Sequence, residues 1–167
     1  MRLTRIQISA AVIGLMLASG AQAQMGGGSM PSSGPAQADA TVPYKNGVTA
    51  LNAGDFPTAI RELRKAYDAN SSEGAIPYAL GLAYAGSGKK AEAKKAFQGA
   101  VRTGNAPIPA YLQLGLVALE LGERDLATKQ YTALQKKLAG CGSKCGDQDR
   151  AEIQSAMDQL AQKLATP

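Results

Sequence analysis

A 34-residue repeat in the middle of this sequence constrains its fold more than any other feature. The segments that begin at Gly47, Gly81 and Gly115 align without a gap, and 34 residues separate each start from the next. The aligned columns carry small, turn-forming or bulky residues, as follows: Ala59, Ala93 and Ala127; Gly54, Gly88 and Gly122; Leu63, Phe97 and Tyr131; Ala66, Ala100 and Leu134.

Each of these columns has a physical reason in a pair of antiparallel helices. The first glycine and the later alanine allow two helices to approach closely, where a larger side chain would push them apart. The middle glycine follows a helical run and adopts the left-handed C-terminal cap conformation without a Cβ penalty. The bulky residue, four positions after the alanine, lies on the same helix face and fills the space between repeats.

This pattern resembles the tetratricopeptide repeat (TPR) family, whose unit is a 34-residue helix–turn–helix. The resemblance covers about residues 40–141, in three repeats at about 40–73, 74–107 and 108–141. It implies an all-α protein, a right-handed α-solenoid of three helix–turn–helix units. Two columns depart from the family pattern. The aromatic residue late in the first helix is Tyr84, but Ala50 and Ala118 replace it elsewhere, and the usual large residue near that helix's start is proline in two repeats.

The segment after the third repeat, 142–167, predicts a loop followed by one more amphipathic helix. Its apolar residues follow the three-and-four spacing of a helix face: Ile153, Ala156, Met157, Leu160 and Leu164. A solenoid must cover its last apolar face, so we expect a capping helix. The alternative is a separate helix that binds a partner.

The resemblance implies that the first helix of each pair lines a concave face. The residues that would project there are mostly apolar: Tyr44, Val48, Leu51, Tyr78, Leu82, Ala85, Leu112, Leu116 and Leu119. Such a groove suits an extended apolar peptide or an amphipathic helix, and so large an exposed apolar surface itself indicates a binding site. The alternative is that the capping helix, the N-terminal tether or a second copy of the chain fills the groove.

The N-terminal residues 1–23 have the three parts of a secretory signal. Arg2 and Arg5 precede an apolar run, and Ala21-Gln22-Ala23 is a small-residue cleavage site. We expect cleavage after Ala23, a bacterial periplasmic or secreted location, and no transmembrane segment afterwards. Residues 24–40, rich in Gly, Pro, Ser and Ala, predict a flexible linker. Loss of the two arginines leaves 16 basic and 13 acidic residues, a net charge of +3, which argues against nucleic acid as a partner.

Several catalytic classes are excluded by composition, because the sequence contains no histidine. Ser-His and Cys-His nucleophile pairs, histidine-ligated zinc and haem attachment all require that residue. A phosphate-binding loop around Gly88-Lys89 would need glycine at Ala83 and a hydroxyl at Lys90. Catalysis by carboxylates needs no histidine, but no acidic pair stands in an apolar stretch where a raised pKa would be expected. We therefore expect no enzyme activity, no cofactor and no metal site.

Basic residues gather on the second helix of the first two repeats, for example Arg64, Lys94 and Lys95. A charged outer helix is normally a solvated face. The alternative is weak peripheral contact with an anionic envelope surface, where each basic residue contributes roughly 1 kcal/mol.

Cys141 and Cys145 flank a short loop before the capping helix. In an oxidising compartment two cysteines this close predict a disulfide. The alternatives are a redox pair, which normally has two intervening residues in an α/β setting, or a metal site, which needs further ligands.

The sequence therefore predicts a non-enzymatic exported adaptor that holds a protein or peptide partner in its concave groove. What the resemblance implies for such proteins in bacterial envelopes is scaffolding or assembly. The alternatives are a structural, self-associating module with a filled groove, and a cysteine-dependent redox or metal carrier.

Overall fold

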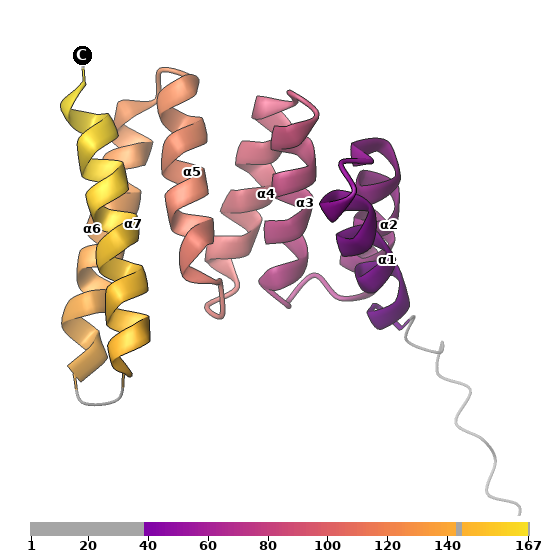
Figure 1. Ribbon diagram of the computed structural model, residues 1–167, viewed down its shortest axis with the longest axis horizontal. Helices are drawn as coiled ribbons and strands as arrows, with labels where there is room; N and C mark the ends of the chain where they lie inside the picture. The colour runs from indigo at the N-terminus through magenta and orange to yellow at the C-terminus, as the bar shows by residue number, and fades with distance from the viewer. Residues whose placement is uncertain (1–38, 143–144, 167) are drawn as a thin grey trace, which may run out of the picture. The chain divides into compact units, whose positions relative to one another are not determined.

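The computed structural model describes residues 39–142 and 145–166, and these residues form seven α-helices and no strand. The helices, shown in Figure 1, are α1 (Thr41–Asn52), α2 (Phe56–Ala69), α3 (Ala75–Gly86), α4 (Lys90–Arg102), α5 (Ile108–Glu120), α6 (Arg124–Cys141) and α7 (Asp147–Ala165). The predicted signal at 1–23 and the predicted linker up to residue 38 lie outside the described residues.

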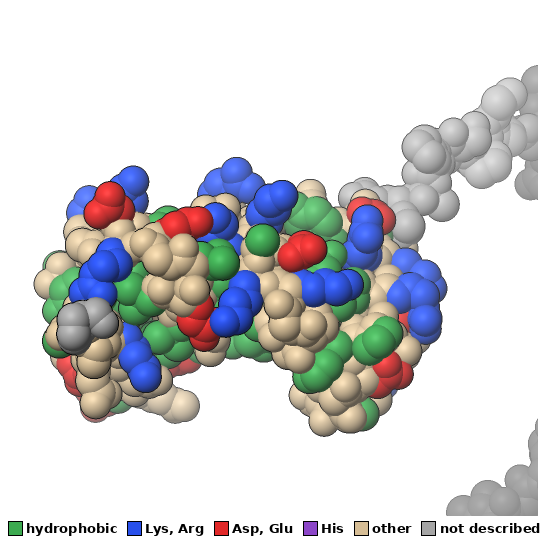
Figure 2. Space-filling view, turned by 90° about the horizontal axis from the view of Figure 1, so that it is seen from above, with side chains coloured by type: hydrophobic (Ala, Val, Ile, Leu, Met, Phe, Trp, Pro, Cys, Tyr) green, Lys and Arg blue, Asp and Glu red, His purple; other side chains and the backbone are tan. Residues whose placement is uncertain are grey.

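The first six helices form three pairs, α1 with α2, α3 with α4, and α5 with α6, as Figure 1 shows. Consecutive pairs pack through α2 against α3 and through α4 against α5. The all-helical fold and the consecutive packing confirm the predicted α-solenoid of repeated helix pairs. Seen from above, the helical unit is indented on the side where α3 and α5 lie (Figure 2). That side is called the concave face below.

The turn inside each pair is built on the glycine that the repeat predicts. Gly54, Gly88 and Gly122 have φ values of 75°, 76° and 76°, which only glycine adopts without strain. In the second pair, the N–H of Lys89 donates to the carbonyl of Tyr84, and the N–H of Gly88 donates to that of Ala85. These bonds satisfy carbonyl groups at the end of α3, so the turn closes the helix and reverses the chain.

The glycine at the start of each repeat permits a close helix approach, as expected, but its neighbour differs between repeats. A Cβ on Gly47 would lie 2.5 Å from Cγ of Leu63, and a Cβ on Gly81 would overlap the ring of Phe97. In the third repeat the neighbour is Leu160 of α7, at 2.8 Å, instead of Tyr131 of α6. Leu63, Phe97 and Leu160 are completely buried, whereas Tyr131 is only partly buried.

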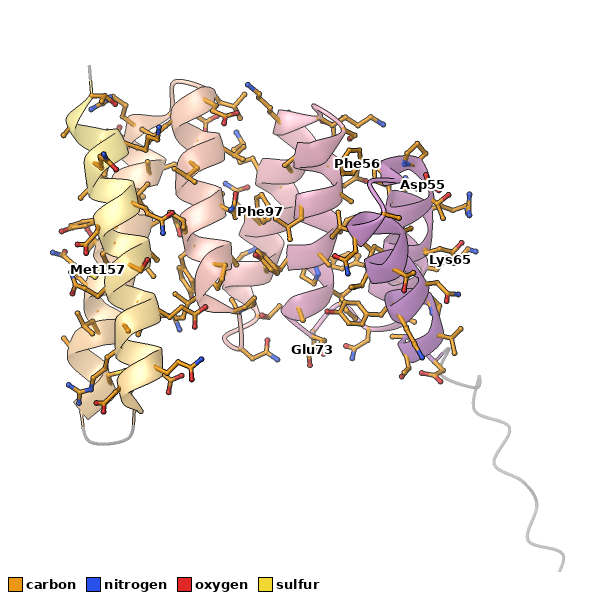
Figure 3. The ribbon with its side chains drawn as sticks, viewed as in Figure 1. Asp55, Phe56, Lys65, Glu73, Phe97 and Met157 are labelled. Carbon is orange, nitrogen blue, oxygen red and sulfur yellow. A yellow bond between two sulfur atoms is a disulfide. The ribbon has the colours of Figure 1, made fainter. Side chains whose placement is uncertain are left out.

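The last helix, α7, packs against both α5 and α6 (Figures 1 and 3). Its buried residues are Ile153, Ala156, Met157 and Leu160, the apolar face that the sequence predicts. Arg124 at the start of α6 donates hydrogen bonds to the carbonyls of Leu164 and Thr166 and so holds the end of α7. Burial of this face against the third pair confirms the capping helix.

Candidate functional site

The nine predicted groove residues come from α1, α3 and α5, and their burial is uneven. Their spacing of four and three residues places those of each helix on one stripe. Eight are partly exposed: Tyr44, Val48, Leu51, Tyr78, Leu82, Ala85, Leu116 and Leu119. Leu112 is only 8% exposed and belongs to the core shared with α7. The structure therefore leaves a partly exposed apolar stripe on the first helices and removes Leu112 from it.

Tyr78 and Leu82 of α3 lie at the middle of this stripe and pack against a buried cluster that contains Phe97. The ring centroids of Tyr78 and Phe97 are 6.0 Å apart and the ring planes are tilted by 43°. This distance lies within the range of favourable aromatic pairs. Leu114 of α5 belongs to the same cluster. At the centre of the concave face, Tyr78 and Leu82 thus pack against buried residues of α4 and α5 and remain partly exposed to solvent.

An acidic group from α7 acts on Tyr78, which the sequence did not suggest. Burial raises the pKa of the Tyr78 phenol above its ordinary value of 10.0, and the carboxylate of Glu152 on α7 raises this pKa further. Glu152 also lines a crevice of about 150 Å³ between α5 and α7, together with Leu112 and Gln159. The phenol is therefore a neutral hydrogen-bond donor at neutral pH, in the field of a negative charge.

Part of this chain matches a known family. The family model of the tetratricopeptide repeat matches residues 78–103, which include most of α3 and all of α4. The matched segment is the middle helix pair, with Gly81, Gly88 and Phe97 in the columns that recur every 34 residues. The match and the seven helices fit a tetratricopeptide repeat protein. No curated protein matches the chain in sequence.

Tetratricopeptide repeats typically serve as non-enzymatic modules for protein–protein interaction. In the described part of the chain, no helix combines the length and the apolar character that a membrane span requires. The concave stripe is where the resemblance places the partner. Sequence reasoning found its α1, α3 and α5 residues but missed Glu152, because α7 follows a loop that breaks the 34-residue period.

The basic residues of α4 are only partly a solvated face. Lys90 Nζ lies 3.0 Å from a carboxylate oxygen of Glu120, and Lys94 Nζ lies 2.5 Å from one of Glu123. Both pairs join the start of α4 to the end of α5 and the turn that follows. Two of the lysines therefore bridge neighbouring repeats, an arrangement that a single-helix pattern does not reveal.

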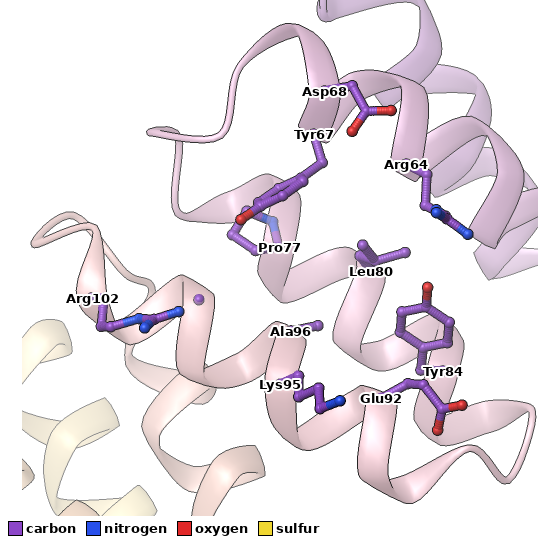
Figure 4. A pocket seen from close by; sticks show the side chains of 11 residues that line it. Arg64, Tyr67, Asp68, Pro77, Leu80, Tyr84, Glu92, Lys95, Ala96 and Arg102 are labelled. Carbon is purple, nitrogen blue, oxygen red and sulfur yellow. The ribbon is translucent and has the colours of Figure 1, made fainter.

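A second groove, which sequence reasoning missed, lies between α2 and α4 on another face of α3 (Figure 4). We call it the outer groove; its volume is about 360 Å³. Pro77 and Leu80 of α3, with Ala96 and Gly99 of α4, form its apolar floor. Small residues at positions 96 and 99 were the available signal, because side chains this short on a helix leave space above it.

Cys141 and Cys145 lie at disulfide distance, with Cα atoms 5.2 Å apart. Cys141 is the last residue of α6 and is 7% exposed, within the core that α7 completes. Among residues 39–142 and 145–166, no group of three or more Cys, Asp or Glu side chains is placed to hold a metal ion. The pair links the end of α6 to the residues just before α7.

Proposed function

We propose that this TPR protein is a non-enzymatic adaptor in the bacterial cell envelope, which holds a protein or peptide partner on its concave face. The observation that carries the proposal is the apolar stripe centred on Tyr78 and Leu82. Eight of its residues remain partly exposed although each packs against a buried cluster. Partly exposed apolar side chains on a firm support are what a groove for a peptide or an amphipathic helix requires.

The partner's chemistry follows from the side chains along the stripe. Val48 and Leu82 present partly exposed apolar side chains, so we propose apolar side chains on the partner there. The phenol of Tyr78 is available as a hydrogen-bond donor, and the carboxylate of Glu152 adds a negative charge that raises the pKa of this phenol. A partner segment with an acceptor and a basic group beside its apolar residues would satisfy both.

The export part of the proposal is supported by the sequence of residues 1–23, with cleavage after Ala23. An envelope location also suits the Cys141–Cys145 pair, because disulfides persist in oxidising compartments. Fractionation of cells that produce the tagged full chain tests this part. Recovery of the uncleaved chain in the cytoplasm would contradict it.

The adaptor proposal is tested by photo-crosslinking in cells. A crosslinking amino acid at Tyr44 or Tyr78 should capture the same partner, and Leu82→Lys should abolish capture. Lysine at this position keeps its methylene groups on the apolar surface and places a charge in the groove. Leu121→Lys is the matched control, because Leu121 is 37% exposed at the end of α5 and outside the stripe.

The outcomes separate the adaptor from the self-associating module. Capture of a second copy of this chain from both positions would favour self-association. A partner captured equally well from Lys136, an exposed residue of α6, or equally well by the Leu82→Lys variant, would contradict the concave-face proposal.

A further inference from the structure

The outer groove takes no part in the proposed concave-face function, yet it combines an apolar floor with a cationic rim. We propose that it is a second docking site, for an acidic amphipathic helix of a partner protein. That helix would place apolar side chains on the floor and carboxylates against Arg64, Lys95 and Arg102, which line the groove.

The first observation in support is the charge of α2 and α4, the helices on either side of the outer groove. The helices α2 and α4 together contain seven basic and three acidic residues. Arg61, Lys65, Lys90 and Lys94 are already paired with glutamates. Within the described part of the chain, none of the ion pairs involves Arg64, Lys95 or Arg102. The rim also holds Asp68 and Glu92, so the groove keeps a surplus of one positive charge.

The second observation is the open space above Gly99 on the apolar floor of the outer groove. A Cβ added to Gly99 would lie 3.7 Å from Cβ of Pro77 and 4.0 Å from the Tyr67 hydroxyl, which are ordinary contact distances. The space above Gly99 is therefore open to a methyl group without displacement of a neighbour. A partner's leucine or alanine side chain finds there an apolar surface bounded by two tyrosines, Tyr67 and Tyr84.

The third observation is the spacing of the basic side chains along α4. Lys95 and Arg102 are seven residues apart on α4, which is two helical turns or about 10 Å. Figure 4 shows Arg102 at one end of the floor and Arg64 toward the other, with Pro77, Leu80 and Ala96 between them. A helix that lies along α4 matches this spacing with two carboxylates seven residues apart and apolar residues between them.

The probe for the test is a synthetic helical peptide with two glutamates seven positions apart that flank a leucine pair on the same face. Its binding to the full chain is followed by fluorescence anisotropy. We expect Lys95→Gln with Arg102→Gln to weaken binding at least about tenfold. Replacement of both glutamates of the peptide by glutamine should do the same, and Gly99→Leu should also weaken binding because it fills the groove.

Two controls separate the outer groove from general charge and from the concave face. Lys129→Gln with Lys136→Gln removes two exposed cations from α6, and it should leave peptide binding unchanged. Leu82→Lys should also leave it unchanged, so the two sites fail independently.

Three results would overturn the proposal. Equal binding of the glutamate and glutamine peptides would remove the charge argument. An equal loss in the α6 control would show nonspecific attraction. Binding to phosphatidylglycerol vesicles that depends on Lys95 and Arg102, with no binding of the peptide, would assign the groove to an anionic membrane instead.

Discussion

Gly81 on α3 lies so close to Phe97 on α4 that any Cβ at position 81 would overlap the aromatic ring. Phe97, labelled in Figure 3, is completely buried. Its ring has no room to move away, because it packs in one cluster with Leu114 and Val117 of α5. One missing side chain in α3 thus makes room for the residue that joins two repeats.

Gly81→Ala is therefore expected to destabilise the fold by about 1–3 kcal/mol, the usual cost of overpacking a core. Gly99→Ala is the matched control, since Gly99 is also inside a helix but has room for a methyl group. It should stabilise the protein by about 0.5–1 kcal/mol through helix propensity. Urea unfolding measures both values. Equal signs for the two substitutions would contradict the packing argument.

The pair Lys94 and Glu123 should couple neighbouring repeats weakly. A double-mutant cycle with Lys94→Met and Glu123→Gln is expected to give about 0.2–1 kcal/mol, because both groups are partly exposed to water. The coupling should decrease at high salt, since salt screens exposed charges. Thermal unfolding at two salt concentrations measures it. A coupling that does not change with salt would show that the contact is not mainly electrostatic.

The raised pKa of Tyr78 leads us to expect a lower free energy of unfolding at alkaline pH. Its pKa is raised in the folded state by burial and then by Glu152, so its stabilising contribution is complete below pH 10. Above pH 10 the unfolded chain releases this proton more readily, and the contribution is lost as pH rises through the folded-state pKa. Unfolding at pH 8 and pH 11 should show a smaller difference for Tyr78→Phe than for the wild type.

Glu152→Gln provides the control for the charge of α7. It should lower the folded-state pKa of Tyr78 without returning it to the ordinary value, because burial remains the larger cause. NMR titration of the phenol carbon measures this pKa directly. An unchanged pKa of Tyr78 would contradict an electrostatic effect of Glu152 on this phenol.

The Cys141–Cys145 pair should add only modest stability. Closure of so short a loop contributes up to about 2 kcal/mol in the chain-entropy model, so Cys141→Ala with Cys145→Ala should lower the unfolding free energy by no more than this. Reductant should lower the stability of the wild type and leave the variant unchanged. Alkylation of both thiols in unreduced protein from the oxidising compartment would contradict the disulfide.

The repeated columns were sufficient to predict most of the fold, because the turn glycines and the close-approach glycines act within one helix pair. Gly54, Gly88 and Gly122 require a positive φ that only the local backbone decides. Leu63 and Phe97 meet glycines of the same pair. Contacts between residues a fixed, short distance apart in the sequence recur with a fixed period. The same period predicted which residues, Tyr78 and Leu82 among them, form the stripe.

Only the tertiary structure decided how the last helix and the outer face are used. Leu160 lies against Gly115, the position that Leu63 and Phe97 take against the matching glycines of the first two repeats. The same helix α7 buries Leu112 and carries Glu152, whose carboxylate adds to the rise in the pKa of Tyr78. The outer groove joins side chains of α2, α3 and α4 that share no period. The sequence by itself determined the helix pairs and their turns, because those depend on near neighbours. The exposure of each face depends on residues far apart in the chain, so packing alone settled it.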